Sequence, residues 1–248
     1  MLMPIRLSLA LLAGVALASC GETKAPADAP AGAAAGGNGG ATAATDWSQA
    51  VVATPEGGFR MGNPDAPVKL IEYASFTCGV CQRFHLEGAE ALKSGLVRAG
   101  RVSYEYRPFL LNAIDVAAAM VATCRGPDQF FTWADQLYRN HDTWVQPFTK
   151  ISDADLKPLG NLPQDQQVRR LAVLGGFDAF VRPRGMARAE FETCMADSER
   201  MKRLMDTQET AMQKMQVTAT PTFFLNGRKV EGATSWDALR PRIEQALR

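Results

Sequence analysis

The feature that most constrains this chain is a pair of cysteines separated by two residues, Cys78 and Cys81. An apolar run over residues 68–74 precedes the pair and predicts a buried strand, and apolar residues at helical spacing follow it. Cys78 is therefore expected at a helix N-terminus, where unpaired backbone N–H groups and the helix dipole favour an anion. Because the thiolate is the reactive form of cysteine, we expect Cys78 to be a nucleophile and Cys81 its shielded resolving partner.

Two less specific uses of the pair stay open at this point. A zinc site needs four ligands, and the other soft ligands beyond residue 20 form no second close pair in the sequence: Cys124, Cys194, His85 and His141. A purely structural disulfide has the same spacing as a redox-active one. The strand before the pair and the helix after it favour the redox site, because they place the first thiol where its thiolate is stabilised.

The first 46 residues predict export and attachment to a membrane. Arg6 and the mainly apolar residues 7–17 are typical of a signal peptide, since the run is shorter than the roughly 20 residues that span a bilayer. The run ends in Leu-Ala-Ser-Cys, which resembles the bacterial lipobox. Residues 1–19 are therefore expected to be removed and Cys20 to carry lipid, with ordinary cleavage beside an incidental Cys20 as the alternative. Residues 20–46, rich in Ala, Gly, Pro and Thr, predict a flexible tether.

Composition and charge narrow the class of protein. The chain has 248 residues, of which 46% are hydrophobic, and this suits one globular core with room for an inserted subdomain. A formal net charge of +1, without a cluster of basic and aromatic residues, argues against a nucleic-acid partner. The four cysteines beyond Cys20 can form two disulfides, which persist in exported proteins and are rare in the cytosol.

Secondary-structure signals predict a sheet interrupted by a long helical block. Strands are expected at residues 50–54, 58–61, 68–74, 101–107, 222–225 and 228–230. Helices are expected beyond Cys81, from residue 114 to about residue 212, and over residues 235–247. Ser152 is expected to cap a short helix in the block, whereas residues 160–185 carry Pro and Gly breaks and give no clear assignment. This order suits a central mixed sheet flanked by helices.

Two segments together resemble the DsbA-like branch of the thioredoxin superfamily. One is Ile-Glu-Tyr leading to Cys-Gly-Val-Cys over residues 71–81, and the other is Val-Thr-Ala-Thr-Pro-Thr-Phe-Phe-Leu-Asn-Gly over residues 217–227. The resemblance covers residues 47–248 and implies an α/β fold, with a thioredoxin-like mixed sheet and an all-helical subdomain inserted at about residues 113–200. Its redox motif would be Cys78, Gly79, Val80 and Cys81.

The resemblance also assigns roles to residues outside the cysteine motif. Pro221 would form a cis peptide bond against the active-site cysteines, and Thr220 would offer free backbone groups to an extended substrate strand. Glu72 matches the position of a buried acid behind the cysteines. A carboxyl desolvated there favours its protonated form and could relay the proton of Cys81; the alternative is an edge strand that turns Glu72 toward solvent. Cys124 and Cys194 resemble a second, structural disulfide, with two free buried thiols as the alternative.

One departure from the family pattern concerns the strength of the oxidant. Strongly oxidising relatives carry His directly before the second cysteine, where an imidazolium stabilises the thiolate, and this chain has Val80. We therefore expect a reduction potential between those of thioredoxin, about −270 mV, and DsbA, about −120 mV. His85, one helical turn beyond Cys81, is expected on the outer face of the helix with no role.

These observations favour a disulfide-introducing enzyme of the bacterial cell envelope, on the periplasmic side, that acts on exported cysteine-containing polypeptides and needs no cofactor. A membrane quinone oxidoreductase resembling DsbB would reoxidise its cysteines. The first alternative is a reductase or isomerase kept reduced by a membrane electron donor. The second is a non-enzymatic envelope lipoprotein, either a metal carrier or a peptide-binding chaperone.

Overall fold

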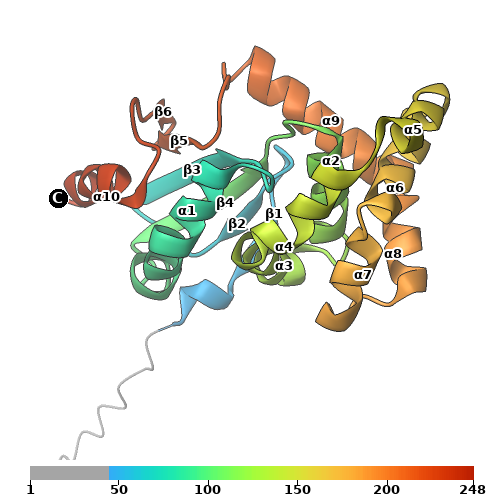
Figure 1. Ribbon diagram of the computed structural model, residues 1–248. Coiled ribbons are helices and arrows are strands. Elements are labelled where there is room, and N and C mark those ends of the chain that lie inside the picture. The colour runs from blue at the N-terminus through green and yellow to red at the C-terminus, as the bar shows by residue number, and fades with distance from the viewer. Residues whose placement is uncertain (1–44) are drawn as a thin grey trace, which may run out of the picture. The chain divides into compact units, whose positions relative to one another are not determined.

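The computed structural model describes residues 45–248, and a mixed sheet of six strands lies at its centre (Figure 1). The strands follow the order β1-β2-β4-β3-β5-β6, in which β3 and β4 are parallel and the other neighbours are antiparallel. Their bounds are β1 (Val51–Ala53), β2 (Phe59–Met61), β3 (Val68–Ala74), β4 (Val102–Pro108), β5 (Thr222–Leu225) and β6 (Arg228–Lys229). Each coincides with a strand expected from the sequence to within one residue at either end.

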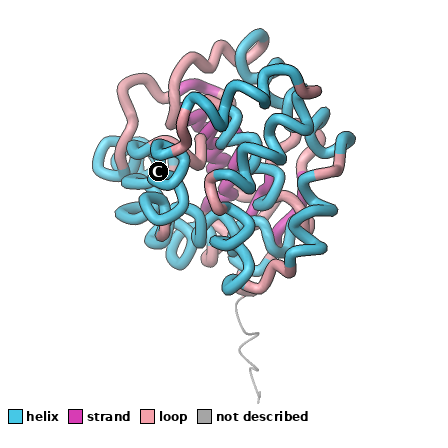
Figure 2. The backbone as a smooth tube through the Cα atoms, turned by 45° about the vertical axis from the view of Figure 1, so that its right-hand side comes forward, coloured by secondary structure: helices cyan, strands magenta, loops and turns pink. Residues whose placement is uncertain are grey.

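Helices enclose the sheet, as Figure 2 shows. The α-helices within residues 45–248 are α1 (Gly79–Phe84), α2 (Ala113–Ala122), α3 (Pro127–Arg139), α4 (His141–Val145), α5 (Asp153–Leu156), α6 (Gln164–Leu174), α7 (Phe177–Val181), α8 (Arg188–Met195), α9 (Ser198–Gln213) and α10 (Trp236–Ala246). Shorter 3-10 turns are η1 (Trp47–Gln49), η4 (Gln146–Lys150), η5 (Lys157–Asn161) and η6 (Arg182–Arg184), and η2 (His85–Ala89) and η3 (Leu92–Val97) are π-helical.

The two parallel strands form the buried middle of the sheet. β3 lies between β4 and β5, and its residues are buried except Lys69 and, in part, Ile71. In β4 all seven residues are buried, although Val102, Tyr104 and Tyr106 alternate with polar residues in the sequence. The alternation suggests one solvent-exposed face. Instead, Tyr104 and Tyr106 pack against Phe131 and Phe130 of α3 on one face, and on the other Glu105 accepts hydrogen bonds from Thr54 and Arg107.

The chain between β4 and β5 is almost entirely helical. Ser152 accepts a hydrogen bond from the backbone N–H of Asp155 and caps α5, as its sequence predicts. The unassigned residues 160–185 form α6 and α7, which the left-handed Gly176 separates. Cys124, just after α2, forms a disulfide with Cys194 in α8, with their Cα atoms 5.6 Å apart. Figure 1 shows α5 to α8 together at one end of the domain and α10 at the other.

The helix that carries Cys81 changes its winding after one and a half turns. α1 passes into the π-helical η2 at His85, and a further π-helical turn follows at η3. His85 lies four residues after the buried Cys81 and therefore faces the same side, toward the sheet. The expected outer-face position of His85 is wrong: the residue is 8% exposed.

The predicted signal segment 1–19, the lipid site Cys20 and all but the last two residues of the 20–46 tether lie outside the described part of the chain. Across residues 45–248 no helix has both the length and the apolar character needed to cross a bilayer.

Candidate active site

Cys78 lies where the sequence places it, at the start of a helix. It is the N-cap residue of α1, with extended backbone angles, and its Sγ accepts a hydrogen bond of 3.3 Å from the backbone N–H of Cys81. The thiol is half-buried, and Gly79 and Val80 beside it are exposed. An attacking sulfur can therefore reach Cys78 from solvent.

The surroundings of Cys78 stabilise its thiolate. Hydrogen bonding from the Cys81 thiol is the largest cause, and the Thr220 hydroxyl and the backbone N–H groups of Cys81 and Val80 act in the same direction. Partial burial opposes them, and the net effect lowers the pKa of Cys78 from 9.0 to about 5. Near neutral pH the reduced protein thus carries a thiolate at this position.

Cys81 has the opposite environment. It is fully buried, and this burial raises its pKa well above the usual value, with Cys78 and the charge of Glu72 adding to the effect. Cys78 and Cys81 are both free thiols in this structure. The pair therefore combines an accessible thiolate with a shielded thiol, which suits a nucleophile and a resolving cysteine.

The segment before β5 closes the site from the opposite side. The Thr220–Pro221 peptide bond is cis, as the sequence predicts, and Pro221 is buried. Cys78 Sγ lies 3.5 Å from the backbone carbonyl oxygen of Thr220. Residues 142 positions apart in the chain thus meet at one point, where α1 begins and β5 is about to start.

Glu72 is fully buried in β3 and does not reach solvent, so the edge-strand alternative is wrong. Its Oε2 accepts a hydrogen bond from the hydroxyl of Tyr104 and lies 3.2 Å from Nε2 of His85. The carboxyl faces the helix that carries Cys81, because His85 directly follows α1 in the same helix. The sequence predicts Glu72 here but not the histidine beside it.

Several further residues of the site have no sequence signal of their own. Tyr106 and Tyr138 place their hydroxyl oxygens 2.8 Å apart, and they donate to the carbonyl oxygens of Ala74 and Ser75 where β3 ends. The buried Asp115 of α2 accepts hydrogen bonds from the hydroxyl of Ser75 and from the backbone N–H of Thr77. Burial raises the pKa of Asp115. These contacts tie the helical insertion to the loop that leads into Cys78.

The candidate metal ligands of the described residues gather away from the cysteine pair. Within residues 45–248, the one cluster of three metal-ligating side chains is Cys124, Glu190 and Cys194, and the two sulfur atoms of that cluster are already joined in a disulfide. Cys78 and Cys81 belong to no such cluster in the described residues.

Comparisons with known proteins agree with this geometry. The thioredoxin family model matches residues 54–245. A putative protein-disulfide oxidoreductase from Rickettsia bellii is 24% identical over 188 residues, which cover 75% of this chain and 63% of that protein. The match thus spans less than two thirds of the length of this relative.

Two solved structures extend the comparison to three dimensions. The protein-disulfide isomerase from Novosphingobium aromaticivorans is 30% identical, with a TM-score of 0.74 over 77% of this chain and 97% of the other. Alpha-DsbA1 from Wolbachia pipientis is 23% identical, with a TM-score of 0.61 over 76% and 89% of the two chains. The predicted fold class is confirmed: a thioredoxin-like mixed sheet with an inserted helical region.

Proposed function

Because this chain belongs to the thioredoxin family over residues 54–245, we propose that it is a protein thiol–disulfide oxidoreductase that introduces disulfides through Cys78 and Cys81. The observation that carries the proposal is the asymmetry of the pair. The half-buried Cys78 caps α1 with a pKa of about 5, while Cys81 is fully buried with a raised pKa. In such a pair one sulfur is open to attack by a substrate thiolate, and the other is shielded and acts as the leaving group or the resolving thiol.

The proposed reaction consists of two exchange steps. A substrate thiolate attacks Cys78 Sγ of the oxidised pair, a mixed disulfide forms, and the Cys78–Cys81 bond breaks with its electron pair on Cys81. A second substrate thiolate then attacks the substrate sulfur of the mixed disulfide, and Cys78 leaves as a thiolate. The substrate loses two electrons and the enzyme pair gains them. The low pKa of Cys78 makes it a good leaving group in the second step.

We expect the substrates to be exported polypeptides that bind as an extended strand. Thr220 precedes β5, so its backbone groups lie before the first paired residue of that strand, Thr222. Its carbonyl oxygen is 3.5 Å from Cys78 Sγ, which puts a bound strand beside the reacting sulfur. Pro221 has no N–H, so it cannot itself donate a backbone hydrogen bond to the substrate strand, and the pairing falls to Thr220.

Glu72 is proposed to act as the proton relay for Cys81. The thiolate released on Cys81 is fully buried, where an uncompensated charge is unfavourable, and it needs a proton source that solvent does not supply directly. Glu72 is the buried carboxyl whose charge acts on Cys81.

The N-terminal sequence and the reaction support a proposal for the location and the redox partner. Residues 1–19 with Cys20 support a lipid anchor in the bacterial cell envelope, with the catalytic domain on the periplasmic side. An oxidising enzyme must return its electrons, so we propose a DsbB-like membrane quinone oxidoreductase as its partner.

A second function, disulfide reduction or isomerisation, is favoured by Val80. The side chain is 39% exposed beside Cys78 and adds no cation to stabilise the thiolate. The Novosphingobium relative is named a protein-disulfide isomerase. A membrane reductant would then replace the quinone-linked partner.

The reduction potential of the Cys78–Cys81 pair separates the two functions. It should be measured by equilibration with glutathione in a C124A/C194A variant, so that the redox change observed comes from Cys78 and Cys81. We expect a value well above about −220 mV, near the upper end of the glutathione range, which identifies an oxidant. A value near about −270 mV would contradict the oxidase assignment and support a reductase or isomerase.

A further inference from the structure

A histidine and a carboxyl share the interior behind Cys81. Nε2 of His85 lies 3.2 Å from Oε2 of Glu72, and the side chains are 3% and 0% exposed. His85 follows Cys81 by four residues, so both point from the same helical face toward β3. We call His85 and Glu72 the buried dyad.

The dyad retains hydrogen-bonding capacity that packing does not use. Within the described residues, neither ring nitrogen of His85 makes a well-directed hydrogen bond, and Oε1 of Glu72 also lacks one. The ring stacks on Tyr138 with centroids 4.0 Å apart and meets Phe84 edge-on. Buried polar atoms without a hydrogen-bond partner are rare in folded proteins, so His85 Nδ1 and Glu72 Oε1, side by side in one interior, call for an explanation beyond packing.

Charge balance suggests that explanation. An isolated carboxylate or an isolated imidazolium is unfavourable in this apolar interior, whereas the two groups with one proton between them carry no net charge. The same holds whether the proton lies on Glu72 or on His85. The dyad can therefore store one proton close to Cys81 without an uncompensated charge.

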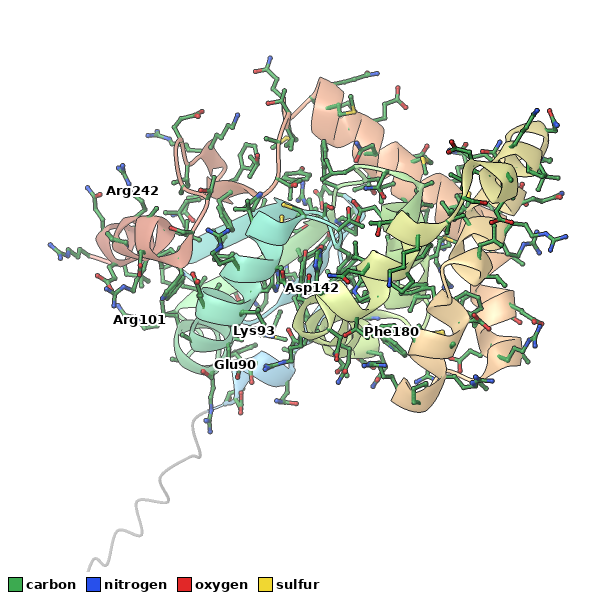
Figure 3. The ribbon with its side chains drawn as sticks, in the orientation of Figure 1. Glu90, Lys93, Arg101, Asp142, Phe180 and Arg242 are labelled. Carbon is green, nitrogen blue, oxygen red and sulfur yellow. A yellow bond between two sulfur atoms is a disulfide. The ribbon has the colours of Figure 1, made fainter. Side chains whose placement is uncertain are left out.

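Other titratable groups also face the dyad from the packed elements. Tyr104 and Tyr106 approach it from β4 and Tyr138 from α3, and burial raises the pKa of all three hydroxyls far above the usual value. Farther along the helix that carries His85, Lys93 of η3, which Figure 3 labels, pairs with Asp135 of α3 at 2.7 Å, and this pair is neutral as a unit. Apart from Cys81, the dyad is thus the part of this layer in which two acidic or basic groups lie close enough to pass one proton between them.

We propose that His85 is a positioning residue that shares one proton with Glu72 and thereby controls when Glu72 gives a proton to the departing Cys81 thiolate. The inference rests on the proposed exchange reaction at Cys78. When a thiolate attacks Cys78, the electron pair of the broken bond leaves on Cys81 Sγ, and Glu72 transfers a proton to that sulfur. The dyad is left with one proton fewer, and it regains the proton from solvent or, in the reverse direction, from the Cys81 thiol.

The test measures the release of Cys81 with reduced glutathione as the attacking thiol. Single-turnover rates of the oxidised protein are recorded from about pH 5 to about pH 9 and divided by the thiolate fraction of glutathione. In the wild type we expect the corrected rate to decrease with rising pH through one inflection, which marks the loss of the dyad's proton. E72Q removes the inflection and lowers the rate on its acid side about 100-fold.

The decisive variant is H85F, which keeps an aromatic ring against Tyr138 but cannot hold a proton. We expect the inflection to move to higher pH by at least about one pH unit, because the carboxyl no longer shares its proton with an imidazole. The double variant E72Q/H85F should match E72Q within about twofold, since the two residues act as one unit. H85Q repeats the test if H85F does not fold.

The chain offers a matched control in its other histidine, His141 of α4, which is also 8% exposed and lies 2.9 Å from Asp142. H141Q should leave the inflection unchanged. An H85F profile that coincides with the wild type, or an additive effect in the double variant, would overturn the proposal. Because glutathione reports on Cys81 release alone, failure to oxidise a two-cysteine model peptide in a parallel assay counts against the proposed function and not against the dyad.

Discussion

Two cysteine pairs in one domain have opposite designs. Cys78 and Cys81 are separated by two residues, lie at a helix start, and are free thiols with shifted pKa values in opposite directions. Cys124 and Cys194 are separated by 70 positions and join the end of α2 to α8.

The difference shows that the sequence separation of a cysteine pair affects the stability of the fold, whereas its environment affects the reactivity of its thiols. A long closed loop restricts the unfolded chain strongly, so the distant pair stabilises the fold. A short loop restricts little, and the neighbouring pair instead sits where backbone N–H groups stabilise a thiolate and make its disulfide easier to reduce. One pair should therefore control activity and the other stability.

Replacing the nucleophile should give the largest effect. C78S should lower the rate of oxidation of a two-cysteine model peptide by at least about 10⁴-fold, because the serine hydroxyl cannot form the mixed disulfide. The C124A/C194A variant, assayed at a temperature where it is folded, should retain activity within about twofold. Comparable losses in both variants would show that the two pairs do not have separate roles.

Removing the distant disulfide should instead lower the free energy of unfolding. The chain-entropy relation gives about 4 kcal/mol for a closed loop of 70 residues. Urea unfolding of the C124A/C194A variant should show this decrease. The C81S variant, compared with wild-type protein whose Cys78 and Cys81 are reduced, should show a much smaller change. A loss below about 1 kcal/mol would mean that the helical insertion is held by its packing and not by the disulfide.

A third difference between the two pairs is a pH dependence of stability confined to the reduced neighbouring pair. The pKa of Cys78 is lowered from 9.0 to about 5 on folding, so the thiolate stabilises the folded state fully above pH 9, and this contribution is lost as pH falls through about 5. The difference in melting temperature between the reduced protein and C78S should grow from pH 5 to pH 9. The intact Cys124–Cys194 disulfide has no titrating thiol and adds nothing to this slope. A difference that does not vary with pH would contradict the lowered pKa.

Much of the fold follows from local patterns in the sequence. The apolar run 68–74 becomes β3, the Asn226-Gly227 turn joins β5 to β6, and Ser152 caps the helix that follows it. These signals depend on neighbours within a few residues, which is why they can be read without the tertiary structure. Residues 160–185 could not be assigned, because their Gly and Pro residues turned out to separate short helices that only packing stabilises.

The sequence by itself determined the cysteine pair and its place at a helix start, because both belong to a short motif with a local physical cause, and the family resemblance added the cis proline. Only the tertiary structure decided that β4 is buried on both faces and that His85 lies against Glu72. Both depend on which elements cover a strand or a helix. Burial is a property of contacts between distant segments, so the periodicity of one segment cannot fix it.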